Sequence, residues 1–303
     1  MSRYLVTGGA GFIGSHLVDQ LVSEGHHVVI LDDLSTGSSK NIPHRKEVEL
    51  VEGSILNLPV LEEIFSRIDG CFHLAAVASV QKSIFEWSKS HHVNLTGTLN
   101  IFLQASLRNV PVVYASSAAV YGDAKTFPLR ETENLKPLSP YAIDKMSCEL
   151  QAKIFGALKN LKSCGLRPFN VYGRRQLKNS DYSGVISIFK QLGEEQKELT
   201  IFGDGYQTRD FIHVMDVARA FVQALGVAST SAPVVNVCTG GGCTINTLAQ
   251  MILKITQAKG IHYLPAQPGN IGTSVGDPRL AETILNFKAR IDLEEGLSDF
   301  CKS

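Results

Sequence analysis

The sequence predicts an α/β protein built on a doubly wound parallel sheet, with a smaller α+β part toward its C-terminus. Short apolar runs alternate with helical patterns through the first half of the 303 residues. Runs that are apolar throughout and separated by helices are typical of parallel strands buried on both faces. We expect strands at 3–7, 27–32, 48–52, 71–74 and 112–116, and helices around 12–24, 57–67, 94–107 and 140–158.

The first predicted strand leads directly into the glycine-rich stretch TGGAGFIGSH, residues 7–16. Ile13, Leu17 and Leu21 follow at four-residue steps, which indicates a strand, a tight turn and then a helix. Such a turn leaves backbone N–H groups at a helix N-terminus, where the positive end of the dipole can hold a pyrophosphate.

An acidic pair supports a dinucleotide site. Eighteen residues after Gly14, the second apolar run ends in Asp32 and Asp33. A carboxylate at this place can accept hydrogen bonds from the ribose hydroxyls of adenosine and would repel a 2′-phosphate. The sequence therefore favours NAD over NADP as a cofactor.

Composition excludes several kinds of partner. The formal net charge is zero and no basic block is present, which argues against nucleic acid and anionic membranes as partners. No apolar run approaches the ~20 residues of a membrane span, and Met1 leads into a strand without a signal peptide, so we expect a cytoplasmic protein. The six cysteines are scattered and lack clustered histidines, so we expect reduced thiols and no metal site.

The stretch SPYAIDK, residues 139–145, predicts the start of a helix, because Ser139 is a good N-cap and Pro140 suits the first helical position. Tyr141 and Lys145 then project from one face. A cation beside a phenol favours the phenolate, so the pair can act as a general base toward a sugar or alcohol hydroxyl. The alternative is a surface helix with a solvated lysine.

The stretch YASSAAVYG, residues 114–122, ends the predicted fifth strand. Hydroxyls at the carboxyl end of such a strand face the crevice in which a nicotinamide is expected. Ser117 is thus a candidate partner of the reacting oxygen. The alternative is that Ser116 and Ser117 only cap the following turn.

Taken together, these motifs make the chain resemble an extended short-chain dehydrogenase/reductase, and within that superfamily the NAD-dependent nucleotide-sugar 4-epimerases acting on UDP-glucose or UDP-N-acetylglucosamine. The resemblance runs nearly end to end. It includes HLAA at 73–76, VNLTGT at 93–98, RPFNVYGRRQ at 167–176 and IFGDGYQTRDFIHVMDVARA at 201–220. It implies a Rossmann-type fold, tightly bound NAD and a UDP-sugar substrate.

The resemblance implies a role for each matching position. Tyr141 would be the base, Lys145 its activator and ribose anchor, and Ser117 the hydroxyl partner. The implied cofactor-binding residues are Gly8, Gly11, Phe12, Ile13, Gly14, Asp32, Asp33, Ser35, Thr36, Gly37, Ser54, Ile55, Leu74, Ala75, Ala76, Asn94, Ser116, Tyr141, Lys145 and Val171. The implied substrate-binding residues are Ser117, Tyr141, Asn170, Gly184, Val185, Thr200, Phe202, Arg209, Gln267, Asn270 and Ser274.

Two of these substrate positions have a defined chemical rationale. Arg209 would hold the diphosphate, since its fork can bond two phosphate oxygens. Phe202 would pack on the uracil ring, although it can equally be strand core. In the implied reaction, Tyr141 takes the proton of the sugar 4-hydroxyl while the C4 hydride passes to NAD, and the hydride then returns to the opposite face of the 4-keto sugar.

Three positions depart from the family pattern. Ser54 stands where many relatives have an aspartate that reaches adenine, which predicts slightly weaker adenine contacts. Gln267 replaces a usual arginine, and losing that charge-assisted bond, about 1.5–3 kcal/mol, would weaken substrate binding tenfold or more. Ser274 occupies a position where some members carry a tyrosine. The small serine predicts room for an N-acetyl group, and hence turnover of UDP-GlcNAc and UDP-GalNAc.

Other activities of the same fold are alternatives. Related 4,6-dehydratases and UDP-glucuronate decarboxylases carry an acidic residue where this chain has Ala118 and Ala119, which cannot transfer protons. This argues against both activities, whereas UDP-uronate 4-epimerisation stays open. A non-catalytic NAD-sensing protein is disfavoured because Ser117, Tyr141 and Lys145 are all retained.

The resemblance also sets expectations for domains and assembly. Residues 1–166, including the Tyr/Lys helix, are expected to bind NAD. Residues 167–303 are expected mainly to bind the UDP-sugar, with some segments packing back on the first part. Relatives commonly form homodimers through two helices per subunit. The matching apolar faces here, which can equally pack inside one subunit, are Leu99, Phe102 and Leu103 with Met146, Leu150 and Ile154.

Overall fold

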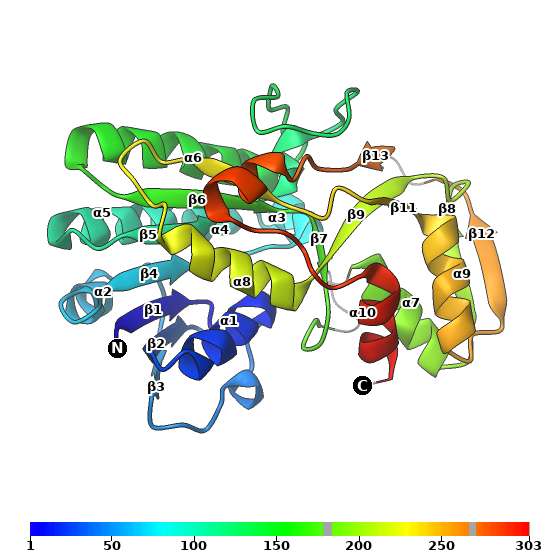
Figure 1. Cartoon of the computed structure of the whole chain (residues 1–303), viewed down its shortest axis with the longest axis horizontal. Helices are drawn as coiled ribbons and strands as arrows, with labels where there is room; N and C mark the ends of the chain where they lie inside the picture. Colours follow the sequence, from blue (N-terminus) through cyan, green and yellow to red (C-terminus); the bar gives the residue numbers. More distant parts are fainter. Residues whose placement is uncertain (178–183, 267–270, 303) are drawn as a thin grey trace.

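The computed structural model, which describes residues 1–177, 184–266 and 271–302, is centred on a seven-stranded parallel sheet (Figure 1). Its strand order is β10-β6-β5-β4-β1-β2-β3. The chain order reverses between β1 and β4, which makes the sheet doubly wound, as predicted. The strands are β1 (Arg3–Thr7), β2 (His27–Asp32), β3 (Val48–Glu52), β4 (Gly70–His73), β5 (Val112–Ala115), β6 (Ser163–Pro168) and β10 (Val234–Val237).

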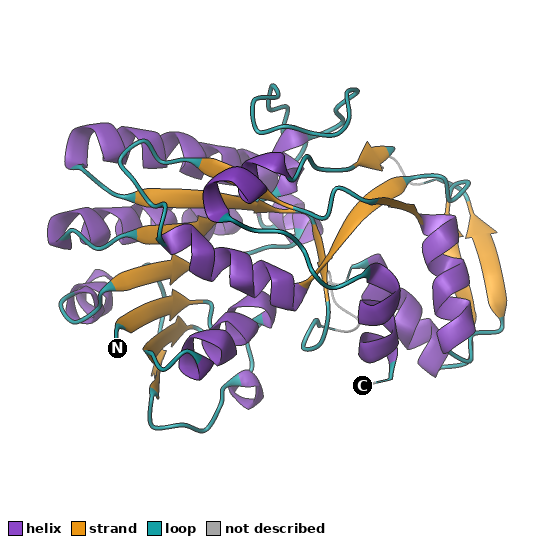
Figure 2. Cartoon of the chain, viewed as in Figure 1, coloured by secondary structure: helices purple, strands orange, loops and turns teal. Residues whose placement is uncertain are grey.

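Helices cover both faces of this sheet (Figure 2). One face packs against α1 (Phe12–Ser23) and α8 (Val214–Leu225) through residues such as Leu17 and Phe221. The other face packs against α2 (Leu58–Phe65), α5 (Thr98–Arg108) and α6 (Pro140–Lys159) through residues such as Phe102. Successive strand residues point to opposite faces, so Leu5 and Val6 of β1 belong to different cores.

Two strands of the large sheet, β6 and β10, were not among the expected strands. β6 reads SCGLRP, which lacks the apolar run of its neighbours, yet every residue in it is buried. Ser163 and Arg167 lie inside, and Gly165 is required because a Cβ there would come within 2.6 Å of the Tyr114 ring. The expected boundary at 166/167 falls within this strand.

The remaining elements extend beyond the carboxyl ends of the large sheet. A short parallel pair, β8 (Glu198–Phe202) and β12 (Gly260–Leu264), shares a core with α7 (Val185–Glu194), α9 (Ile245–Ile255) and α10 (Leu293–Cys301). Four strands link this region to the large sheet: β7 (Asn170–Tyr172), β9 (Thr208–His213), β11 (Gly242–Thr244) and β13 (Thr273–Ser274). The side chains of Leu248 and Ile252 in α9 are completely buried, like the core side chains around the large sheet.

The segment before α5 differs from a regular helix. Two short helices, α3 (Val80–Phe85) and α4 (Trp87–His91), lead into a π-helical turn at His92–Gly97. The helix expected at 94–107 thus starts as a π turn, a feature often found near functional sites. Within the described residues, no helix is long and apolar enough to cross a membrane.

Candidate active site

The glycine turn after β1 forms a bare backbone cradle. Gly8 has φ of +69°, and a Cβ there would lie 2.8 Å from the backbone nitrogen of Ala75. A Cβ on Gly14 would lie 2.1 Å from the Gly8 carbonyl oxygen. Helix α1 begins at Phe12 after Gly11, with no side-chain cap and no acidic residue in its first turn. Its N–H groups and dipole therefore suit a pyrophosphate, and only glycine allows this close packing.

Asp32 lies at the end of β2, beside this turn. Its Oδ2 accepts a hydrogen bond from Ala10 N at 2.9 Å and its Oδ1 accepts one from Leu34 N at 2.9 Å. Burial raises the pKa of Asp32, and those two backbone bonds partly offset the rise. Each oxygen keeps a further lone pair, so the carboxylate can still accept from ribose hydroxyls. A Cβ on Gly37 would come within 2.8 Å of Asp32 Oδ1, which places residue 37 directly against it.

The other expected adenosine contacts lie close in sequence to these groups. Asp33 Oδ1 accepts from the backbone and the hydroxyl of Ser35, at 3.0 and 2.6 Å, so the two form one turn with Thr36. Ser54 Oγ accepts from Leu56 N at 3.2 Å. The neighbouring Ile55 is buried, and a Cβ on Gly97 would lie 2.4 Å from its Cδ1.

The end of β4 is fixed to the glycine turn by Thr7, which the sequence analysis did not single out. Thr7 Oγ1 accepts from the backbone nitrogens of Leu74 and Ala75, both at 3.2 Å. It also shares a hydrogen bond with His73 Nδ1 at 2.7 Å. Burial, with the nearby Lys145 cation, lowers the pKa of His73 to about 3, so the imidazole is neutral. Leu74 and Ala75 thus line the cradle, and Ala76 follows them in the chain.

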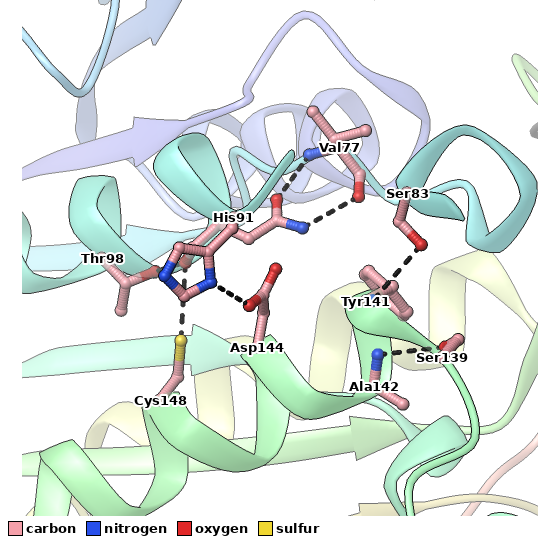
Figure 3. A network of polar contacts seen from close by, with 10 residues as sticks. Val77, Ser83, His91, Thr98, Ser139, Tyr141, Ala142, Asp144 and Cys148 are labelled. Carbon is pink, nitrogen blue, oxygen red and sulfur yellow. Dashed lines mark hydrogen bonds and ion pairs between the residues drawn. The ribbon is translucent and has the colours of Figure 1, made fainter. Parts of the chain in front are cut away.

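Asn94 holds the loop that follows β4 (Figure 3). Its Oδ1 accepts from Val77 N at 2.8 Å, and its Nδ2 donates to Val77 O at 3.2 Å. The side chain is almost completely buried. The carboxamide is therefore engaged with the protein's own backbone, and its expected place near the nicotinamide stays a prediction.

Helix α6 presents Tyr141 and Lys145 as predicted from its sequence. Ser139 Oγ caps it by accepting from Ala142 N at 3.2 Å, and Ser83 Oγ accepts from Tyr141 N at 3.3 Å (Figure 3). The Lys145 ammonium lies 5.8 Å from the centre of the Tyr141 ring and donates to Ala115 O at 2.7 Å. The lysine is buried, so the alternative of a solvated surface lysine does not apply.

The two serines at the end of β5 have different surroundings. Ser117 caps a 3₁₀ turn at Ala118–Tyr121, because its Oγ accepts from Ala119 N at 3.1 Å. That hydroxyl keeps its own proton available as a donor. Ser116 is buried, and its hydroxyl donates to Glu149 Oε1. Ser117 therefore caps the turn, as the alternative expects. It does so as an acceptor, so its hydroxyl proton can still be donated to a ligand.

Three of the expected substrate residues lie on paired strands: Asn170 on β7, Arg209 on β9 and Ser274 on β13. Arg209 of β9 is partly buried and donates only to backbone carbonyls among the described residues, to Thr208 O at 2.9 Å and Gly272 O at 3.4 Å. Burial lowers the pKa of this guanidinium, and the described chain offers it no carboxylate partner. A half-buried cation of this kind suits a phosphate ligand. Asn170 of β7 is adjacent, since its Nδ2 donates to Asp210 O at 3.0 Å, and Val171 follows it.

The remaining expected substrate residues of the C-terminal part lie on other elements or outside the described residues. Thr200 and Phe202 belong to β8, where Phe202 is 36% exposed and so is not buried as strand core; its contact with the uracil stays a prediction. Gly184 precedes α7, which begins at Val185. Gln267 and Asn270 lie outside the residues that the structure describes.

Sequence reasoning also missed Asp210, which is completely buried. Its carboxylate accepts from Thr239 N at 2.9 Å, Thr239 Oγ1 at 2.7 Å, Gly240 N at 2.9 Å and Gly276 N at 3.3 Å. Burial raises the pKa of Asp210, and these donors offset only part of the rise. The carboxylate joins the loop after β10 to the segment after β13. An acidic residue directly before the apolar pair Phe211 and Ile212 of β9 was the available signal.

Comparison with known proteins identifies the family. The model of the "NAD dependent epimerase/dehydratase family" matches residues 4–238. A putative UDP-glucose 4-epimerase of Methanocaldococcus jannaschii is 37% identical over 297 residues, covering 97% of this chain and 95% of that protein. UDP-glucuronic acid decarboxylase 1 of Danio rerio is 31% identical, covering 98% of this chain and 71% of that protein.

Solved structures agree with this assignment. The UDP-glucose 4-epimerase of Thermotoga maritima with UDP-glucose has a TM-score of 0.94 and 37% identity, covering 99% of this chain and 97% of that one. The UDP-N-acetylglucosamine 4-epimerase of Methanobrevibacter ruminantium, in complex with UDP-N-acetylmuramic acid, has a TM-score of 0.95 and the same identity and coverage. The glycine cradle, Asp32 and the Lys145 side chain fit the NAD that the family uses. The chain belongs to the NAD dependent epimerase/dehydratase family and is an NAD-dependent isomerase related to the UDP-sugar 4-epimerases.

Proposed function

We propose that this protein is a UDP-hexose 4-epimerase that interconverts UDP-Glc with UDP-Gal, and UDP-GlcNAc with UDP-GalNAc. The observation that carries the proposal is the arrangement of Tyr141, Lys145 and the strand end. Lys145 bonds Ala115 O at 2.7 Å, beside Ser117, and its ammonium lies 5.8 Å from the Tyr141 ring. A phenol and a cation thus lie near the carboxyl end of β5, two residues before the Ser117 hydroxyl in the chain, and ligands of doubly wound sheets bind at this end.

The chain's own residues move a proton and hold the sugar. NAD, when bound, supplies the reversible oxidation at C4. Tyr141 takes the proton from the 4-hydroxyl and returns it after the 4-keto sugar has turned over, while the Lys145 cation stabilises the phenolate. Ser117 donates to the C4 oxygen. Arg209 holds the diphosphate, which lets the sugar turn about a fixed anchor, and Phe202 packs on the uracil.

Ser274 supports the N-acetylated substrates. It lies in β13 and pairs with Arg209 in β9, which supports a placement in which a sugar whose diphosphate binds Arg209 lies beside this position. A serine side chain occupies far less volume than a tyrosine and leaves space beside the 2-substituent. The cited relatives include enzymes named for both UDP-glucose and UDP-N-acetylglucosamine.

The residues that follow Ser117 favour this function over dehydration and over decarboxylation, which is an alternative because UDP-glucuronic acid decarboxylases are among the relatives. Ala118 and Ala119 start the 3₁₀ turn at the site and offer no acidic group. UDP-uronate 4-epimerisation uses the same chemistry at C4 and is the alternative, in which the sugar's C6 carboxylate would need a partner of its own.

The test is incubation of the purified protein, without added cofactor, with UDP-Glc and separately with UDP-GlcNAc, and detection of the C4 epimers by proton NMR. The proposal expects equilibrium mixtures from both. Conversion of UDP-Glc alone would keep the reaction and reject the argument from Ser274. Conversion of neither, even with NAD supplied, would reject the proposal and favour a uronate or non-UDP substrate.

We also propose a cytoplasmic homodimer in which residues 1–166 bind NAD and residues 167–303 mainly bind substrate. All six cysteines are free thiols, as in a reducing compartment. Phe102 is completely buried within the subunit, but other apolar side chains of α5 and α6 are 38–73% exposed: Leu103, Leu107, Leu150, Ile154 and Leu158. A second copy would cover them. Light scattering should give twice the chain mass, and Leu150→Asp should reduce it to that of one chain.

A further inference from the structure

A buried ion pair lies directly behind the strand end that carries Ser117. Glu149 of α6 and Arg167 of β6 have side chains only 5% and 4% exposed. Arg167 Nε donates to Glu149 Oε1 at 2.8 Å, and its Nη2 donates to Oε2 at 2.6 Å. Burial alone would lower the pKa of Arg167, but the hydrogen bonds with Glu149 and its charge raise that pKa overall. The fork is therefore bidentate, and neither charge reaches solvent.

This pair is bonded to the strand end through Ser116, whose hydroxyl donates to Glu149 Oε1. One turn earlier on α6, Lys145 donates to Ala115 O at 2.7 Å. Two consecutive residues of the strand end are thus tied to two successive turns of the helix that presents Tyr141. The next residue in the chain is Ser117.

The network continues toward the segment that carries Ser274. Arg167 Nη1 donates to the Tyr121 hydroxyl at 2.8 Å, which itself donates to Asn236 Oδ1 at 2.7 Å. Asn236 Nδ2 donates to Leu129 O at 2.9 Å, and Leu129 N donates to Val275 O at 2.8 Å. One hydrogen-bonded chain therefore runs from α6, behind the strand end, to the neighbour of Ser274.

We propose that Glu149 and Arg167 are positioning residues for the epimerase reaction, because they hold the Ser117 strand end in register with Tyr141 on α6 and with the Ser274 segment. Neither residue touches the substrate. A buried ion pair is weak evidence for stability, since two apolar residues of the same shape often serve as well. A displacement of about 1 Å at a reacting group, by contrast, can cost about a hundredfold in rate. The proposal rests on the proposed function for its kinetic readout.

The experiment compares Glu149→Gln, Ser116→Ala and a matched core variant, Ile64→Ala. Glu149→Gln keeps the shape but leaves Arg167 without its counter-charge. Ser116 was expected to bind the cofactor, but its buried hydroxyl donates to Glu149, so Ser116→Ala leaves the ion pair intact and removes its bond to the strand end. Ile64 of α2 is 1% exposed and lies outside this network, so Ile64→Ala supplies a general loss of stability.

We expect kcat to fall about tenfold to a hundredfold in Glu149→Gln and at least about fivefold in Ser116→Ala. KM, the Kd of free UDP and the amount of NAD retained should stay within threefold of the unsubstituted enzyme. Ile64→Ala should lower Tm without lowering kcat at a temperature at which it is folded. A kcat within twofold of the unsubstituted enzyme in both network variants, or losses that follow Tm equally in all three, would overturn the proposal.

A second readout separates this proposal from the proposed function. Amide hydrogen exchange over residues 113–121 should speed up in Glu149→Gln and Ser116→Ala but not in Ile64→Ala, whether or not a UDP-hexose is turned over. Faster exchange there with no epimerase activity in the unsubstituted protein would reject the function and keep the positioning role. Unchanged exchange in an active enzyme would reject the positioning role alone.

Discussion

Ser274 lies directly opposite Arg209, in the parallel pairing of β13 with β9. The two residues are 65 positions apart in the sequence, and each was singled out for a different reason. Their pairing places the residue proposed to limit the sugar's 2-substituent beside the half-buried cation proposed to hold the diphosphate. Under the proposed function, substrate choice and substrate anchoring would therefore involve neighbouring strands of one small sheet.

Substitution of Ser274 tests whether the size of this side chain limits the sugar's 2-substituent. Ser274→Tyr should suppress turnover of UDP-GlcNAc by a factor of at least about ten relative to UDP-Glc, because the ring would fill the space for the N-acetyl group. Ser274→Ala stays small and should not discriminate between the two pairs. The measurement is kcat/KM for both substrates by NMR, and equal losses on both in Ser274→Tyr would contradict the role of this position.

Arg209 is expected to contribute through its fork as well as through its charge. Arg209→Gln should weaken the binding of UDP by about tenfold to a hundredfold, since a charge-assisted bond contributes about 1.5–3 kcal/mol. Arg209→Lys should lie in between. Titration calorimetry with UDP measures this directly. Arg67→Gln removes an arginine that pairs with Glu49 on the far strand β3 and serves as the control; an equal effect there would reject a specific role for Arg209.

Tyr141 is expected to act in chemistry and not in cofactor retention. Tyr141→Phe should lower kcat by about a hundredfold to ten-thousandfold, the range typical of general acid–base groups, while the purified protein still carries NAD. Chemical analysis of the released cofactor measures the NAD content, and the NMR assay measures kcat. An unchanged rate would contradict the phenolate mechanism.

The glycine cradle predicts a severe effect of one methyl group. In Gly14→Ala the added Cβ would lie 2.1 Å from the Gly8 carbonyl oxygen, which forces the turn to move. The variant should lose retained NAD and melt at a lower temperature. Gly25→Ala is a control for strain alone, since φ there is +83° but no atom lies within 4 Å of the new Cβ. Retention of NAD in Gly14→Ala would contradict the placement of the cofactor on this turn.

Asp277 predicts a pH dependence of stability close to Ser274. Its bonds with Arg279, together with the charge of Arg130, lower the pKa of this carboxyl to about 2. Because the folded-state pKa lies below the unfolded one of about 3.9, the contribution is complete above pH 4 and is lost as pH falls toward 2. The Tm difference between the unsubstituted protein and Asp277→Asn should therefore shrink across that interval. If the Tm difference stays constant from pH 6 down to the lowest pH at which the protein folds, the stabilising role of the ionised Asp277 is contradicted.

The sequence predicted the elements that depend on residues close together in the chain. Three strands, β1, β2 and β3, have the predicted bounds: β1 and β2 contain short apolar runs, and β3 mixes apolar residues with Glu49 and Glu52. Helix α6 starts at Pro140 as its cap predicts. The fold class followed from the same alternation and is confirmed.

What the sequence could not predict depends on contacts between distant residues. Strand β6 holds Arg167 in the core only because Glu149 supplies the opposite charge from another element. Thr7 and Asp210 are short polar side chains whose importance comes from the loops that they join. Asn94 looked like a ligand residue in the sequence, and its amide is engaged with Val77 of the chain itself.

The central claim is that one site oxidises and reduces the same sugar at C4, and an isotope label tests it most directly. UDP-Glc carrying deuterium at C4 is incubated with the purified protein in ordinary water, without added NAD, and the UDP-Gal formed is examined by NMR and mass spectrometry. The account predicts UDP-Gal that retains the deuterium at C4. Loss of the label to solvent, or no UDP-Gal at all from a protein that retains NAD, would contradict it.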